Sequence, residues 1–138
     1  MPKTPIGLAD PDLVVSLNLD PCAPRAARHY VAQVDHPSPD LRDAVMLLTG
    51  EVVTRAAQEC QASLPQAAEL RVWMPAEVVR VELRTPPDMV SPLRDGDARQ
   101  YGEMLLRQVA DRWSIDSSRD FACMWFEIDR RDSRSQAV

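Results

Sequence analysis

Strands are predicted where apolar and polar residues alternate along the chain. Successive side chains of a strand point to opposite faces of a sheet, so a period of two indicates a strand with one buried face. Leu13–Leu19 alternates in this way from Val15 onward, and Pro75-Ala76-Glu77 separates two alternating segments that we interpret as a hairpin. The predicted strands cover residues 13–19, 69–74, 78–84, 113–116 and 121–128.

Helices are predicted where apolar residues recur at spacings of three and four. Asp20-Pro21 is typical of a helix start, because an acceptor side chain caps free amides and proline fits the first turn. The apolar positions that follow are Ala23, Ala27, Tyr30, Val31 and Val34.

Two further helices are expected. The second begins after Pro37-Ser38-Pro39, with Ser38 or Asp40 as its cap. Its apolar stripe consists of Leu41, Val45, Leu48, Val52, Val53, Ala56 and Cys60. The third covers residues 98–112, with apolar positions at Met104, Leu105, Val109 and Tyr101.

The order of these elements predicts an α+β sandwich, a mostly antiparallel sheet covered on one face by helices. Residues 1–12 are expected to form a flexible arm, residues 13–129 the single domain and residues 130–138 a polar tail. In the last strand, Met124, Phe126 and Ile128 should pack beneath the helices, with Cys123, Trp125 and Glu127 on the other face.

Composition excludes several classes of function. A chain of 138 residues, 45% of them hydrophobic, suits one domain. It has neither an apolar run of about 18 residues nor a signal peptide, so we expect a cytoplasmic protein that does not enter a membrane. A net charge of −5 disfavours nucleic-acid binding. Three widely spaced cysteines indicate reduced, mostly buried thiols, and with only two histidines we expect no metal site.

Three blocks of sequence resemble a known family. They are Met46–Ala57, Val109–Trp113 and Met124–Ile128, and Pro24–Val31 adds a fourth. In this order they resemble the small anti-sigma factor serine kinases, single-domain members of the GHKL (Bergerat) ATPase superfamily, over residues 13–129. The resemblance implies a Bergerat ATPase-like fold, an ATP-magnesium site, a homodimer, and two partners: a sigma factor and an anti-anti-sigma protein of the STAS type.

The resemblance also assigns positions on the second predicted helix. Glu51 matches the glutamate that acts as general base in phosphoryl transfer. Arg55 stands where the family has the asparagine that holds magnesium, and a guanidinium has no lone pair for a cation. Arg55 could pair with Glu51 across one helical turn or replace the metal beside phosphates, and the sequence leaves both alternatives open.

The remaining nucleotide motifs of the family are altered in this chain. Thr85 takes the place of the aspartate that binds adenine, and prolines follow it where the family has glycines, although Asp88 could substitute after a shift of three residues. In the phosphate motif Gly102 matches the second glycine, Gln100 replaces the first, and Glu103 puts a carboxylate near the polyphosphate.

These changes predict an anti-sigma-like regulatory protein that acts by binding proteins, in which nucleotide binding is lost or weak and no cofactor is expected. Arg25 and Arg28 on the first helix match the region through which the family engages its sigma factor. The alternative is an active serine/threonine kinase of a STAS protein, which would use Glu51 together with ATP and magnesium. A third reading is an interaction domain unrelated to transcription.

Overall fold

The computed structural model describes residues 10–34, 38–59, 67–75, 77–86, 104–117 and 121–130. A short helix at residues 104–109 precedes the fourth strand. The labelled elements are, in chain order, β1 (Leu13–Asn18), α1 (Ala23–Ala32), α2 (Pro39–Glu59), β2 (Ala67–Trp73), β3 (Val78–Thr85), β4 (Arg112–Ser117) and β5 (Ala122–Asp129).

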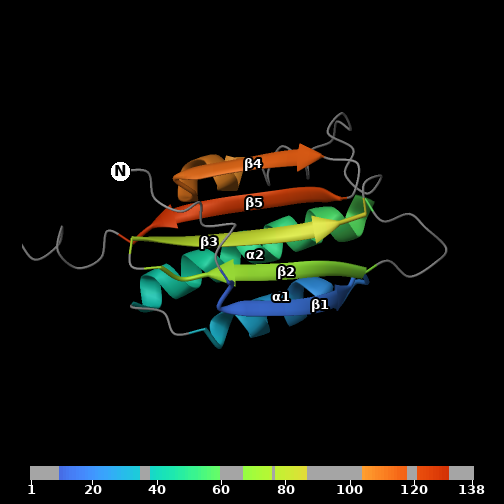
Figure 1. Ribbon diagram of the computed structural model, residues 1–138, viewed down its shortest axis with the longest axis horizontal. Helices are drawn as coiled ribbons and strands as arrows, with labels where there is room; N and C mark the ends of the chain where they lie inside the picture. Colours follow the sequence, from blue (N-terminus) through green and yellow to red (C-terminus); the bar gives the residue numbers. More distant parts are fainter. Residues whose placement is uncertain are drawn as a thin grey trace, which may run out of the picture.

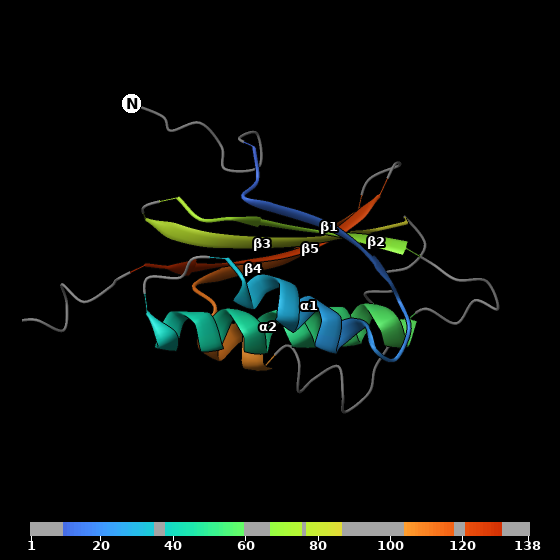
Figure 2. The same ribbon diagram turned by 90° about the horizontal axis from the view of Figure 1, so that it is seen from below.

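The strands form one antiparallel sheet in the order β1-β2-β3-β5-β4 (Figure 1). The helices lie in a layer against one face of this sheet (Figure 2). The other face is called the outer face below. This arrangement confirms the predicted α+β sandwich and the predicted hairpin, β2 with β3.

The core lies between the sheet and the helices. Val72, Val81 and Phe126 stand opposite one another on β2, β3 and β5, and the next row is Leu70, Leu83 and Met124. Phe126 is fully buried, and Met124 and Ile128 belong to the same cluster, which confirms the predicted faces of the last strand. Because every strand keeps a period of two, the opposite residues all fall on the outer face.

The first helix begins later than the sequence suggested. It starts at Ala23 with Cys22 as N-cap, and its first turn contains Pro24. Asp20 accepts a hydrogen bond from the backbone N–H of Cys22 at 2.8 Å, so it organises the turn before the helix instead of capping it. The predicted apolar face is correct, since Ala23, Ala27 and Val31 are buried.

The second helix begins as predicted. The Ser38 hydroxyl accepts a hydrogen bond from the backbone N–H of Leu41 at 3.1 Å, as an N-cap side chain does. The stripe facing the core is also confirmed at Val45, Leu48, Val52, Val53 and Ala56. Cys60 lies outside the described residues.

The third helix departs from its prediction at two points. Leu106 is the buried residue, whereas Met104 is 49% exposed, so the apolar face was assigned wrongly; Leu105 and Val109 do pack against the core. The helical residues end at 109, and Arg112 already belongs to β4. Asp111 turns the chain into the strand by donating its backbone N–H to the Glu127 carbonyl at 2.9 Å. Tyr101 lies outside the described residues.

The described end of the N-terminal arm is tied to the sheet. Asp12 donates its backbone N–H to the Val72 carbonyl at 2.7 Å and accepts the backbone N–H of Met74 on its carboxylate at 2.6 Å. Within the described part of the chain, no helix combines the length and the apolar character that a membrane crossing requires.

Candidate functional site

A small pocket opens between α2, the helix at 104–109 and the sheet. The empty space between its walls is about 300 Å³, including the part open to solvent. Apolar side chains supply most of the lining. The lining residues are Glu51, Val52, Arg55, Leu106, Trp113, Ser114, Ile115, Met124 and Trp125.

The pocket brings together two of the predicted site residues. Glu51 and Arg55, one helical turn apart on α2, both line it. Among the described residues no ion pair joins Glu51 to Arg55, which was one of the two alternatives left open by the sequence, and Arg55 does have an interaction partner. Neither a hydrogen bond nor an ion pair holds the Glu51 carboxylate within the described part of the chain.

Thr85 does not line the pocket. It is 3% exposed at the end of β3, and its hydroxyl donates to the Pro86 carbonyl at 3.4 Å. Gln100, Gly102, Glu103 and Asp88 lie outside the described residues. Among the described residues, no cluster of three or more histidine, cysteine or acidic side chains is arranged to hold a metal ion.

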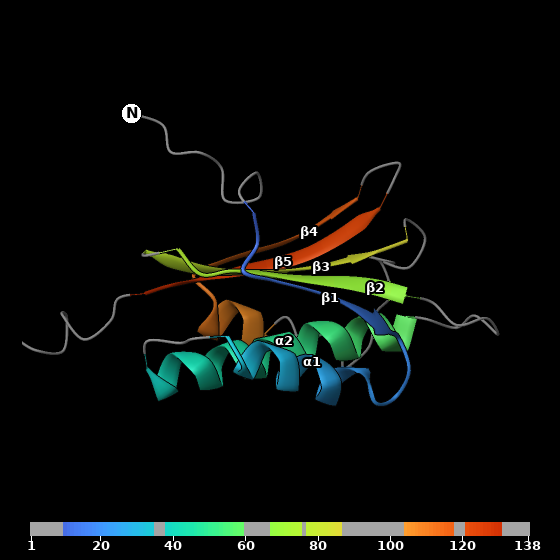
Figure 3. The same ribbon diagram turned by 60° about the horizontal axis from the view of Figure 1, so that its bottom comes forward.

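Helix α1 belongs to the layer of helices on one face of the sheet (Figure 3), and its charged residues are basic. The helix carries Arg25, Arg28 and His29 and contains no acidic residue. His29 is hydrogen-bonded to Gln33 at 2.8 Å. Arg25 is exposed and Arg28 is half-buried. Neither arginine forms an ion pair with any acid of the described residues.

Gly50 of α2 sets the position of Arg28. A Cβ atom at Gly50 would lie 2.6 Å from a terminal nitrogen of Arg28 and 3.3 Å from its Cδ. A glycine inside a helix costs about 1 kcal/mol relative to alanine. Here it lets the Arg28 side chain lie flat across α2. The α1 and α2 surfaces therefore join closely at this point.

Leu47 of α2 is a large apolar residue with 44% of its surface exposed. It lies one turn before Gly50 and Glu51 on the same helix, so it stands between the Arg28 side and the pocket side of α2. We call Arg25, Arg28 and Leu47 the α1–α2 surface. Its combination of one apolar residue and two cations is suited to a protein partner.

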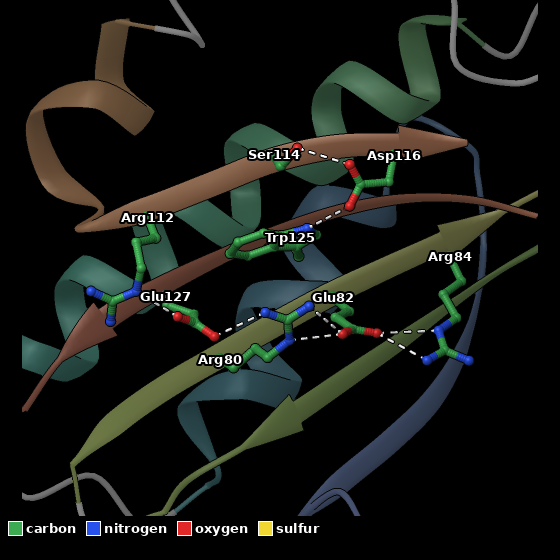
Figure 4. Close-up of polar contacts among 8 residues, drawn as sticks. All are labelled: Arg80, Glu82, Arg84, Arg112, Ser114, Asp116, Trp125 and Glu127. Carbon is green, nitrogen blue, oxygen red and sulfur yellow. Dashed lines mark hydrogen bonds and ion pairs between the residues drawn. The ribbon is translucent and has the colours of Figure 1, made fainter. Parts of the chain in front are cut away.

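The outer face carries an ion-pair ladder that our sequence reasoning missed (Figure 4). Glu82 of β3 accepts from Arg80 at 2.7 Å and from Arg84 at 3.1 Å. Arg80 also reaches Glu127 of β5 at 2.9 Å, Glu127 accepts from Arg112 of β4 at 2.7 Å, and Arg112 contacts Asp129. The alternation of charge in Arg80-Val81-Glu82-Leu83-Arg84 was the signal available in the sequence.

Two residues on the outer face have raised pKa values. Hydrogen bonds to Asp129 first, and then to Glu127, raise the pKa of Arg112 above its ordinary value. Burial, followed by the charge of Glu82, raises the pKa of the Cys123 thiol to about 12. Cys123 is a free buried thiol as expected, whereas Cys22 is free and exposed and is an exception to the expectation of mostly buried thiols.

Trp125 completes the outer face. The guanidinium carbon of Arg80 lies 4.2 Å from the centre of the Trp125 ring, a cation–π contact. The indole N–H donates to Asp116 at 2.9 Å, and Ser114 donates to the other oxygen of the same carboxylate at 2.9 Å (Figure 4). These contacts leave the charges of this face engaged with one another.

The chain was compared with protein-family models and with curated proteins. The chain matches no protein-family model, and a search of curated proteins finds no significant match.

Proposed function

We propose that the chain is a regulatory protein that acts by binding other proteins, in the manner of an anti-sigma factor, and that the nucleotide-dependent step of the family is lost. The proposal joins the sequence resemblance, which names the class of partner, to the α1–α2 surface. A sigma factor is the first partner, and a STAS-type anti-anti-sigma protein is the second.

One contrast carries the proposal. Every arginine on a strand, Arg71, Arg80, Arg84 and Arg112, is paired with an acid of its own chain. Arg25 and Arg28 pair with no acid of the described residues, although the chain as a whole has a net charge of −5. Cations that pair with no described acid, on a helix packed against the one that carries exposed Leu47, favour a partner with an acidic rim around an apolar contact.

The pocket supports the loss of the nucleotide step. Arg55 occupies the magnesium position and lines the pocket, and a guanidinium only donates hydrogen bonds. Thr85 is buried with its hydroxyl directed to the Pro86 carbonyl, and its side chain carries no carboxylate for adenine. Phosphoryl transfer depends on a metal ion placed beside the phosphates. A partner would then be exchanged by competition at the surface.

The direct test is binding of a candidate sigma factor to variants of the α1–α2 surface. We expect the double charge reversal Arg25→Glu/Arg28→Glu to weaken the complex at least tenfold and to reduce its salt dependence, because exposed ion pairs are screened by salt. Gly50→Ala should also weaken it, by pushing Arg28 off α2. Met104→Lys, which places a charge at an equally exposed site on another helix, is the control and should bind like the parent. Equal binding by all four proteins would remove the α1–α2 surface from the proposal.

A second candidate function is the active kinase. It is favoured by the carboxylate of Glu51, which lines the pocket and has no hydrogen-bond partner among the described residues, so its oxygens can accept a proton from a substrate in the pocket. Incubation with ATP labelled at the γ-phosphate and a STAS protein distinguishes the two candidates. Label transfer that Glu51→Ala abolishes would establish the kinase, and absence of transfer agrees with the binding protein.

A further inference from the structure

Two apolar residues on the outer face are shielded from water, and we call them the outer apolar pair. Trp73 of β2 is 1% exposed and Val78 of β3 is 7% exposed, yet neither belongs to the core cluster between the sheet and the helices. Trp73 stands opposite Arg80, whose side chain lies on the outer face (Figure 4). Val78 is the diagonal neighbour of Trp73 across the hairpin, within reach of an aromatic ring. The shielding is local, because Val14 of β1 on the same face is 48% exposed.

The described neighbours of Trp73 direct their side chains elsewhere. Arg80 points towards β5, since its guanidinium carbon lies 4.2 Å from the centre of the Trp125 ring. Arg71, two residues earlier on β2, contacts an acid of its own strand. Asp12 uses its carboxylate to accept the backbone N–H of the residue after Trp73. These contacts leave the indole to be covered by another part of the chain.

The chain enters β1 directly beside the outer apolar pair. Asp12 donates its backbone N–H to β2 one residue before Trp73, and the described residues begin at position 10. The sequence before them is Thr4-Pro5-Ile6-Gly7-Leu8-Ala9. An extended chain spans about 3.3 Å per residue, so Leu8 can reach about 13 Å from Asp12. Ile6 and Leu8 share one face of an extended segment, so this segment has both the reach and the apolar side chains to cover the pair.

We propose that residues 4–9 lie across the outer face and pack Ile6 and Leu8 on the outer apolar pair. The segment then acts as a strap that keeps the pair from water and from other proteins. The opposite end of the chain also starts nearby, because Asp129 stands opposite Val78. Residues 131–136, however, are all polar (Arg-Asp-Ser-Arg-Ser-Gln), which makes them a poorer cover for apolar side chains. The strap lies on the face opposite α1 and α2, so the proposed function does not depend on it.

Hydroxyl-radical footprinting of the full chain tests the proposal, because peptide mapping reads the oxidation of each tryptophan separately. In the parent protein we expect Trp73 to be oxidised at least tenfold more slowly than half-buried Trp113 and Trp125. The double variant Ile6→Asp/Leu8→Asp should raise the oxidation rate of Trp73 to the level of the other two, because carboxylates do not pack on an indole. The rates of Trp113 and Trp125 should not change.

The matched control adds the same two acids at the other end of the chain. Ala137→Asp/Val138→Asp should leave Trp73 protected. Both double variants change residues outside the described sheet and helices, so both should fold, as circular dichroism would verify. Three results would overturn the proposal: rapid oxidation of Trp73 in the parent, protection that persists in Ile6→Asp/Leu8→Asp, or protection that the control abolishes, which would assign the cover to residues 131–138.

Amide hydrogen exchange tests the same contact from the side of the segment. We expect the amides of residues 6–9 to exchange more slowly in the parent than in Trp73→Ala, which removes the larger member of the outer apolar pair. Val14→Ala changes an exposed residue of the same face and should exchange like the parent. Exchange of residues 6–9 at the rate of an unstructured peptide in the parent, or equal exchange in the parent and Trp73→Ala, would also overturn the proposal.

Discussion

Arg55 is the residue on which the nucleotide question depends. It stands at the magnesium position of the resembling family and lines the pocket beside Glu51. We predict that Arg55→Asn alone will not create measurable Mg-ATP binding, because Thr85 remains buried with its hydroxyl donating to the Pro86 carbonyl. Isothermal titration calorimetry of the variant measures this. Micromolar affinity for Mg-ATP would mean that Arg55 is the single obstacle and that the rest of the site is intact.

Cys123 and Cys22 should differ sharply in reactivity. The thiolate is the reactive form of cysteine, and burial keeps the Cys123 thiol protonated by raising its pKa to about 12. At pH 8 we therefore expect alkylation of exposed Cys22 to be at least a hundredfold faster than that of Cys123. Peptide mapping by mass spectrometry reads each cysteine separately.

The raised pKa of Cys123 also predicts a pH dependence of stability. An unfolded cysteine ionises near its reference pKa of 9, and the folded one near 12. The stability due to the protonated thiol is therefore complete below about pH 9 and is lost as the pH rises towards 12. Cys123→Ala should flatten the loss of stability in this window. An unchanged slope in denaturant titrations at several pH values would rule out Cys123 as its source.

Among the elements, the strands were the easiest to predict from sequence. Alternation in β5 placed Phe126 on the correct face because a period of two leaves only two choices of face. The helix at 104–109 was harder. Met104, Leu105 and Leu106 are consecutive apolar residues, so periodicity alone did not decide between exposed Met104 and buried Leu106.

The start of α1 and the ion-pair ladder could be predicted only in part. The Asp20 carboxylate can accept a backbone N–H either as a helix cap or within a turn, so the sequence alone does not distinguish the two. In the structure it accepts the N–H of Cys22 in the turn before the helix. Charges spaced by two in β3 indicated a shared face, but the link from Arg80 to Glu127 joins residues 47 positions apart. That contact depends on β3 and β5 being neighbours, which the sequence did not reveal.

The ion-pair ladder leads to a prediction about the stability of the protein. Glu82 is bound by two arginines with only 4% of its side chain exposed, whereas Glu69 pairs with Arg71 alone and keeps 41% exposed. Removing one partner of a buried ion pair costs about 3–5 kcal/mol, and an exposed pair contributes about 0–1 kcal/mol. We expect Glu82→Ala to lower the free energy of unfolding by about 2 kcal/mol or more, and the matched variant Glu69→Ala by under about 1 kcal/mol. Equal losses in urea denaturation would mean that the ladder adds nothing beyond its exposed members.

At the scale of the whole molecule, the outer face of the sheet and the helical layer differ in how their charged residues are paired. The outer face satisfies its charges internally, through the ladder and through Trp125 with Asp116. The helical layer keeps Arg25, Arg28 and Leu47 available at its surface. The fold thus separates a self-contained sheet from a helical surface suited to a partner, and this separation is the physical basis of the proposed function.

The central claim is that the chain binds a sigma factor through α1 and α2 without help from a nucleotide. It is tested most directly by measuring the Kd between the chain and each sigma factor of its source organism, with and without Mg-ATP. We predict that at least one sigma factor binds, that its Kd is the same in both conditions, and that Arg25→Glu/Arg28→Glu raises it at least tenfold. A complex that forms only when Mg-ATP is present, or the absence of binding to every sigma factor, would contradict the account.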